Sequence, residues 1–292
     1  MRITSAMFMR NAIARLFQNR ADMMNTQERI ASQKKIEKPS DNPVGFSRAN
    51  RLREAYRQNK TFLKNVQSSQ AWMDNTSSIL DQLHQFAMSA VTDASHGLDA
   101  VVTDDVRQAI ASQLSGILQE SVSLLNSTYM GKNVFAGTET KMQKPFTQNG
   151  LDVTYSGNGD KIKRRISKQM VMDINVSGDE LMATNFFSAM KETIEALQNG
   201  DQEAIKTAVD HLKKAEKNVL KVSTVYGSKI SNLQLIKDRL ISSNENLKEY
   251  ISQEEDAVLE EELVKLKSQQ VAYQATLQTT SDIMNLSILK YL

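Results

Sequence analysis

At 292 residues the chain is long enough for one or two domains, and it is 40% hydrophobic but only 6% aromatic, with three prolines. This composition is more typical of extended helical packing than of a β-sandwich or a doubly wound sheet. The 36 basic and 34 acidic residues leave a net charge of +2, which gives no bulk attraction toward nucleic acid or an anionic membrane. Cysteine is absent and the three histidines show no ligand spacing, so neither a metal site nor a cofactor is predicted.

Catalytic and targeting motifs are also missing from the sequence. It contains no G-x-S-x-G, Walker-type or dinucleotide-binding motif, so a non-enzymatic role is predicted. No apolar run reaches the roughly 18 residues that a transmembrane helix needs. Arginines interrupt the first twenty residues, which therefore lack the continuous apolar stretch of a secretory signal. If the protein leaves the cell, we expect another export route.

The N-terminal segment is predicted to be an amphipathic helix that pairs with a second helix. Its apolar residues fill most of a 4,3-spaced stripe, which is the spacing of a coiled-coil seam. The stripe consists of Met9, Ile13, Leu16, Met23 and Ile30, with Arg20 and Gln27 at its two remaining positions. The segment Lys38-Pro39-Ser40-Asp41-Asn42-Pro43 is expected to end this helix, because proline lacks an amide donor and disfavours helix at the preceding residue.

A much longer helix is predicted to follow. Two rows of residues recur every seven positions, and so long a repeat implies a supercoiled partner. The rows are Leu52, Asn59, Val66, Met73, Leu80, Ala87 and Ala94, and Ala55, Phe62, Ser69, Thr76, Leu83 and Ala90. Residues 93–105, which include Gly97, are expected to turn the chain, with Thr103 as a candidate N-cap for a helix running back over residues 106–124.

The pattern changes to period two between Gly131 and Gly178, where six of the eleven glycines fall. Val153 and Tyr155 alternate with polar neighbours, and residues 157–160 (Gly-Asn-Gly-Asp) predict a tight turn. Residues 161–166 and 170–176 are predicted to be further strands. The basic run at residues 161–165 is expected on a hairpin strand, where charge discourages edge-to-edge pairing.

Helix is predicted again from Phe186, with a break at Asn199-Gly200-Asp201, and the stretch from Val222 to the end contains no proline. Its last part again shows alternating 4,3 spacing, with Leu259, Leu263, Leu266, Gln270, Tyr273, Leu277, Thr280 and Met284. Beyond it, apolar side chains occupy nearly every face, which predicts partners rather than a stable monomer surface. The acidic groups at residues 254–256 and 260–262 are expected on a solvated helix face.

Both ends of the chain are thus expected to bury apolar surface only on assembly. The predicted assembly interface consists of Ile3, Met7, Ile13, Leu16, Met23, Ile30, Leu263, Leu266, Tyr273, Leu277, Met284, Leu286, Leu289 and Leu292. The expected fold is mainly α: a long coiled-coil-like helical rod with paired N- and C-terminal helices and a small β-rich inserted domain.

Residues 28–53, ERIASQKKIEKPSDNPVGFSRANRLR, resemble the N-terminal signature of the flagellin superfamily. The signature loop Pro39, Ser40, Asp41, Asn42 and Pro43 has the form found in hook-associated members rather than in filament flagellins. Residues 131–138, GKNVFAGT, are similar to the family's G-x-x-x-F-A-G-T, and residues 269–292 are similar to its C-terminal helix. The resemblance covers essentially the entire chain.

The resemblance implies a structural subunit that joins the flagellar hook to the filament after secretion through the flagellar type III apparatus. Its implied partners are other copies of itself in a ring of about one helical turn, the first hook-associated protein, flagellin, the filament cap, and a cytoplasmic chaperone on the C-terminal helix. The expected domains are residues 1–40 with 256–292 for polymerisation, 41–130 with 181–255 for the long helices, and 131–180 as an outer domain.

Two alternatives remain open at the level of sequence. One is a filament-forming flagellin with a reduced outer domain, which would elongate indefinitely when seeded. The other is an intracellular coiled-coil scaffold, which predicts a stable dimer with ordered ends.

Overall fold

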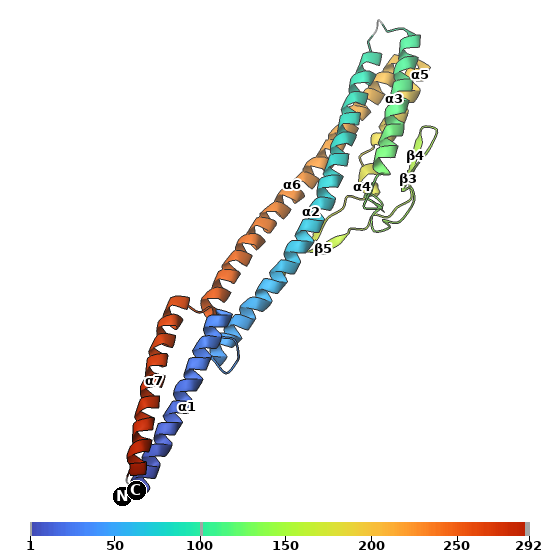
Figure 1. Cartoon of the computed structure of the whole chain (residues 1–292). Helices are drawn as coiled ribbons and strands as arrows, with labels where there is room; N and C mark the ends of the chain where they lie inside the picture. The colour runs from blue at the N-terminus through green and yellow to red at the C-terminus, as the bar shows by residue number, and fades with distance from the viewer. Residues whose placement is uncertain (1, 100–101, 290–292) are drawn as a thin grey trace. The chain divides into compact units, whose positions relative to one another are not determined.

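The computed structural model describes the backbone of residues 2–99 and 102–289, and the side chains of residues 7–99 and 102–282. Long helices dominate it (Figure 1), and the predicted mainly α fold with a small β-rich insertion is confirmed. The helices are α1 (Arg2–Ser32), α2 (Pro43–Gly97), α3 (Asp104–Leu125), α4 (Gly178–Met182), α5 (Phe186–Asn199), α6 (Gln202–Glu255) and α7 (Leu259–Leu289).

The chain forms two compact units, which we describe separately. Unit 1 consists of Met1–Gln58 with Ser243–Leu292, and unit 2 consists of Asn59–Ser242. Unit 1 therefore takes in the first turns of α2 and the last turns of α6 in addition to the terminal helices. The β-rich segment is not a compact unit of its own, because its apolar side chains share the core of unit 2.

The main seam of unit 2 lies between α2 and α6. Both predicted heptad rows of α2 are buried from Val66 to Ala94, which confirms the repeat. On α6 a matching row recurs every seven residues and is also buried: Ile205, Leu212, Val219, Tyr226, Leu233 and Leu240. The helices run antiparallel, since Gln70 donates a hydrogen bond to Gln234 (3.0 Å) while His84, further along α2, lies 3.4 Å from Glu216. Each helix thus supplies the partner that the seven-residue repeat of the other requires.

The turn between α2 and α3 and the break between α5 and α6 fall where the sequence predicts them. Helix α2 ends at Gly97, and Thr103 occupies the N-cap position of α3 with extended backbone but no side-chain capping bond. Gly200 ends α5 with φ of 71°, a left-handed conformation that favours glycine.

Within the described residues the strands form three two-stranded antiparallel ribbons. They are β1 (Thr128–Tyr129) with β2 (Lys132–Asn133), β3 (Phe146–Asn149) with β4 (Asp152–Tyr155), and β5 (Lys163–Arg165) with β6 (Val171–Asp173). The predicted tight turn at residues 157–160 is wrong, because this segment links two strands that do not pair, β4 and β5. Asn158 is used instead to bind the segment after β2: its Oδ1 accepts a hydrogen bond from the backbone amide of Thr138 (2.9 Å).

These ribbons depend on the helices for their core, as expected for two-stranded ribbons with only two to four residues in each strand. Phe146 of β3 is buried against Phe187 of α5, with ring centroids 6.1 Å apart. The hydroxyl of Tyr226, on α6, donates to the backbone carbonyl of Ile174 (2.5 Å), and burial raises the pKa of this tyrosine.

Unit 1 contains α1 and α7, which lie side by side and antiparallel (Figure 1). The proline-free C-terminal stretch is not one helix, because α6 ends at Glu255 and α7 begins at Leu259. Among the described residues, no helix combines the length and the apolar character that crossing a membrane requires.

Candidate functional site

The terminal helix pair is held by a seam in which small and polar residues interrupt the apolar ones. Asn19 donates a hydrogen bond to the hydroxyl of Thr276 (2.8 Å), and Arg29 lies 3.8 Å from Glu262. The half-buried or buried positions on α1 are Met9, Ala12, Leu16, Asn19, Asp22, Met23, Thr26, Arg29, Ile30 and Ser32, and those on α7 are Glu262, Leu266, Gln269, Gln270, Tyr273, Thr276 and Thr280. Only Thr26 and Thr280 are fully buried in this set, so the pair encloses no continuous apolar core.

The seam differs from the predicted 4,3 stripe at every second position. Met9, Leu16, Met23 and Ile30 face α7 as predicted, but Ala12 takes the place expected for Ile13, whose exposed fraction is 39%. On α7, Leu263 and Leu277 are likewise displaced from the seam, with exposed fractions of 48% and 43%. The 4,3 and 3,4 spacings share every seventh residue, and a modest rotation of the helix about its axis decides between them.

The apolar side chains that the seam leaves out face solvent along both helices. Phe17 is 61% exposed and Val264 is 72% exposed, far above what large apolar residues show in a core. The full set is Met7, Phe8, Ile13, Phe17 and Met24 on α1, and Leu259, Leu263, Val264, Val271 and Leu277 on α7. Together they give the terminal pair an extended apolar surface, which in soluble proteins marks an interaction site.

The predicted interface residues divide into three groups. Met7, Ile13, Leu263 and Leu277 are exposed, whereas Leu16, Met23, Ile30, Leu266 and Tyr273 are half-buried in the seam between α1 and α7. The side chains of Ile3, Met284, Leu286, Leu289 and Leu292 lie outside the described residues. The prediction from the sequence did not single out Phe8, Phe17, Met24, Val264 and Val271, because they lie off the predicted stripe. Their apolar character on an otherwise polar helix face is the signal that could have found them.

A groove of about 330 Å³ runs beside the seam near the start of α1. Its walls include Ala12 and Arg15 of α1 and Ala275 and Thr279 of α7. Small side chains leave this space unfilled, so the two helices alone do not close their own interface.

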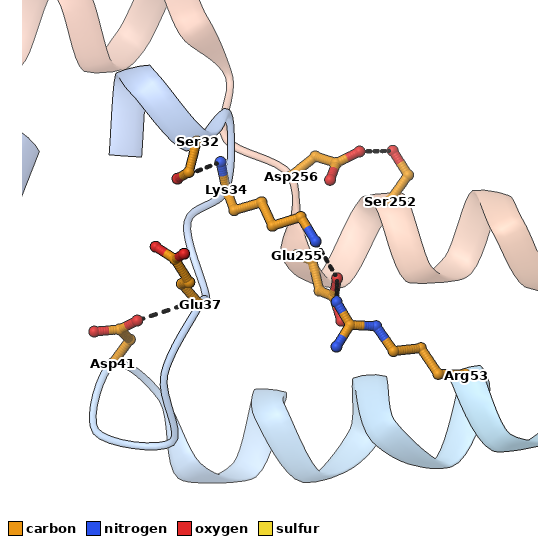
Figure 2. A network of polar contacts seen from close by, with 8 residues as sticks. All are labelled: Ser32, Lys34, Glu37, Asp41, Arg53, Ser252, Glu255 and Asp256. Atoms are coloured by element: carbon orange, nitrogen blue, oxygen red, sulfur yellow. Dashed lines mark hydrogen bonds and ion pairs between the residues drawn. The ribbon is translucent and has the colours of Figure 1, made fainter. Parts of the chain in front are cut away.

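A junction segment, residues 33–42, ties the end of α1 to the ends of α6 and α2 (Figure 2). The backbone amide of Lys35 donates to the carbonyl of Glu255 (2.7 Å), and the amide of Ala257 donates to the carbonyl of Gln33 (2.9 Å). The ammonium group of Lys35 also reaches the carbonyl of Gln253 (2.6 Å). The two Lys35 donors satisfy carbonyls at the C-terminus of α6 that have no partner within the helix, and the lysine charge complements the helix dipole there.

Glu255 is the central charge of the junction. Its side chain is only 3% exposed, and its carboxylate accepts hydrogen bonds from Lys34 (3.3 Å) and from Arg53 of α2 (Figure 2). A buried carboxylate at a helix C-terminus is costly, and the two cations offset that cost. The expectation of a solvated acidic face is therefore wrong for Glu255, because the junction segment folds over it.

The predicted signature loop performs local capping. The Asp41 carboxylate accepts hydrogen bonds from the amides of Lys38 (2.9 Å) and Glu37 (3.0 Å), which lower the pKa of this carboxyl group. Asn42 Oδ1 accepts from the amide of Gly45 (3.0 Å) and so caps α2. All five residues, 39–43, are exposed; the buried contact nearby is Gly45 against Ile36.

This architecture is similar to that of known proteins. Residues 3–140 match the family model of the bacterial flagellin N-terminal helical region. The matched part, which includes α1, the junction segment and α2, is therefore similar to the flagellin N-terminal region.

Two curated relatives extend the similarity to nearly the whole chain. The flagellar hook-associated protein 3 of Escherichia coli (strain K12) is 23% identical, with 99% of this chain and 98% of the relative covered. The protein of the same name from Salmonella typhimurium is 24% identical over the same shares of each chain. The predicted resemblance to the flagellin superfamily and to this hook-associated protein is confirmed, and neither relative is named as an enzyme.

Solved structures show the same fold. Bacillus cereus FlgL is 22% identical with a TM-score of 0.60, covering 69% of this chain and 98% of that structure. The flagellar junction protein FlgL from Legionella pneumophila is 10% identical with a TM-score of 0.62, covering 72% of this chain and 100% of that structure.

Proposed function

We propose that this chain is a structural subunit of the bacterial flagellum, located at the junction between hook and filament. In this proposal it is secreted through the flagellar type III apparatus and polymerises through α1 and α7 into a ring of about one helical turn. Its support is the similarity, over 99% of the chain, to proteins named flagellar hook-associated protein 3, together with the shared fold.

The observation that carries the polymerisation step is the mismatch in the terminal pair. Its seam is only partly buried and mixes apolar residues with alanine, threonine, asparagine and charged residues, while Phe17, Val264 and Val271 are exposed. Fully burying such an apolar side chain contributes roughly 1.5–3 kcal/mol. Neighbouring copies that cover several of them would supply the stabilisation that the isolated pair lacks.

The proposed partners follow from the same surface and from the resemblance. One side of the ring would contact the first hook-associated protein, and the other would receive flagellin or the filament cap. Before secretion, a cytoplasmic export chaperone would cover α7, whose exposed Val264, Val271 and Leu277 would otherwise favour aggregation.

Seeded assembly on isolated hooks that carry the first hook-associated protein tests the proposal. We expect the full chain to add a ring of limited length, seen by electron microscopy, and a chain lacking residues 277–292 to add none while keeping the helical circular dichroism of unit 2. The point variant Phe17→Ser should also reduce ring formation, whereas Phe17→Leu, which keeps the site apolar, should not. Ring formation by the truncated chain at the wild-type level would refute the role of the termini.

The same assay separates the alternatives. A filament flagellin would elongate without limit on the seeds, and a coiled-coil scaffold would ignore the hooks and form a stable dimer. Hydrogen exchange on the free chain adds an independent reading: we expect the amides of α1 and α7 to exchange much faster than those of α2 between Val66 and Ala94.

A further inference from the structure

The β5–β6 ribbon ends in a basic tip that its own chain does not neutralise. We define the basic tip as Arg164, Arg165, Lys168, Met170 and Val171, all of which are exposed. Among the described residues, none forms an ion pair with the three cations of the tip, whereas neighbouring Lys161 lies 2.5 Å from Glu180. Met170 and Val171 add exposed apolar surface, with exposed fractions of 48% and 52%.

The tip is held in a fixed shape, which is useful for docking because little order must be gained on binding. Its turn closes through the amide of Ile166, which donates to the carbonyl of Met170 (3.0 Å), and the amide of Met170 donates to the hydroxyl of Ser167 (3.1 Å). Asn65 of α2 donates to the carbonyl of Arg165 (2.9 Å) and anchors the strand.

The last turns of α6 and the residue that follows the helix carry a surface of opposite charge. We define the acidic face as Glu245, Glu249, Tyr250 and Asp256, all exposed. Glu245 and Glu249 are four residues apart and lie on one side of α6, and Asp256 directly follows the last residue of the helix, Glu255. The hydroxyl of Ser252 donates a hydrogen bond to the Asp256 carboxylate. In the part of the chain that the structure describes, no cation pairs with them, although Glu254 and Glu255 beside them are paired with Arg48 and Arg53.

We propose that the basic tip of one copy docks on the acidic face of a second copy. Three cations meet three carboxylates, and Met170 and Val171 can pack on the exposed ring of Tyr250. The three cations gather at one end of the ribbon, because residues 166–170 form the turn between β5 and β6. Like charges four residues apart, such as Glu245 and Glu249, destabilise a helix, and a basic partner removes that penalty.

A second copy is the occupant that the charges favour. The chain carries both surfaces at distinct places, so the contact is heterologous and can repeat from copy to copy, as a ring or helical array requires. The inference rests on the proposed self-assembly, because it names one of the contacts between subunits.

Charge reversal of the full chain tests this contact in solution, without hooks. One variant carries Arg164→Glu, Arg165→Glu and Lys168→Glu, and the other carries Glu245→Lys, Glu249→Lys and Asp256→Lys. By sedimentation velocity, we expect the wild type to associate weakly and reversibly at an ionic strength of about 20 mM and at least about tenfold more weakly at about 500 mM. Each variant alone should lose association, because its two surfaces now repel each other. Mixed in equal amounts they should regain it, because each tip then meets a face of opposite charge.

The control variant Lys206→Glu, Lys213→Glu and Lys217→Glu changes net charge by the same amount on exposed positions of α6 and should associate like the wild type. The proposed contact is wrong if the wild type does not associate at any salt concentration. It is also wrong if the mixture fails to regain association while both variants keep wild-type unfolding curves.

The hook assay distinguishes a failure of this contact from a failure of the proposed function. A tip variant that still forms rings at the wild-type rate refutes the contact alone, and a wild type that pairs in solution but ignores hooks refutes the junction role alone.

Discussion

Both helix pairs of this molecule have residues that recur every seven positions, but one pair forms a buried core and the other a half-exposed seam. In unit 2, α2 and α6 bury Val66, Met73 and Leu80 completely, and even Thr76 satisfies its hydroxyl on the carbonyl of Trp72 (2.9 Å). In unit 1, the α1 and α7 seam is half-exposed and contains Asn19, Thr276 and Glu262. Identical periodicity therefore does not define equal stability. The residues at the seam decide whether a helix pair is finished or awaits a further partner.

Truncation in the two seams should show the largest difference. Leu80→Ala removes a fully buried side chain and should cost about 2–5 kcal/mol of unfolding free energy, measured by urea titration of helical circular dichroism. Leu266→Ala, in the terminal seam, should cost less than about 1 kcal/mol, because that site is already partly hydrated. If both substitutions cost the same unfolding free energy, the seam between α1 and α7 is as well packed as the core of unit 2.

The junction of unit 1 is expected to be its most sensitive part. Arg53→Met leaves the buried Glu255 carboxylate with Lys34 as its remaining cation and should cost roughly 1–3 kcal/mol of local stability. Hydrogen exchange of α1 and α7 amides reports this cost, while α2 beyond Val66 should be unaffected. The matched change Arg48→Met removes the more exposed pair with Glu254 and should cost about 0–1 kcal/mol. If Arg53→Met leaves the hydrogen exchange of α1 and α7 unchanged, the ion pairs of Glu255 do not stabilise unit 1.

A smaller effect is expected at the start of α2. A Cβ at Gly45 would lie 2.6 Å from Cδ1 of Ile36 and 2.9 Å from the Asn42 side chain, so Gly45→Ala should cost about 1–2 kcal/mol by disturbing the cap. Gly116→Ala, in α3, meets nothing within 4 Å and should instead stabilise unit 2 by about 0.5–1 kcal/mol. Urea unfolding measures both effects: the midpoint should fall for Gly45→Ala and rise for Gly116→Ala. A rise for both variants would contradict the close packing of Gly45 against Ile36.

The smallest expected effect concerns pH. Backbone hydrogen bonds from Lys38 and Glu37 lower the pKa of Asp41, so the charged carboxylate favours the folded loop. Its contribution is present above the pKa of the unfolded chain and is lost as pH falls through the lower folded value. The stability of unit 1 is measured as pH is lowered, in the wild type and in Asp41→Asn. The wild type should lose more stability on acidification. If both proteins lose the same stability as pH falls, the charge of Asp41 does not stabilise the loop.

Sequence alone determined the helical class, the need of α2 for a supercoiled partner and the positions of the turns at Gly97 and Asn199-Gly200, because a seven-residue repeat and glycine act through local geometry. It also determined that both ends carry apolar surface in excess of one seam. Tertiary structure decided which apolar residues are left outside, since Ala12 rather than Ile13 faces α7, and a rotation shared by two helices is not encoded in either spacing. It likewise decided the fate of Glu255, a carboxylate in an acidic run whose burial depends on a segment more than two hundred residues away in the chain. Local patterns fix which side chains a helix offers, whereas contacts between distant segments fix which of them remain available to a partner.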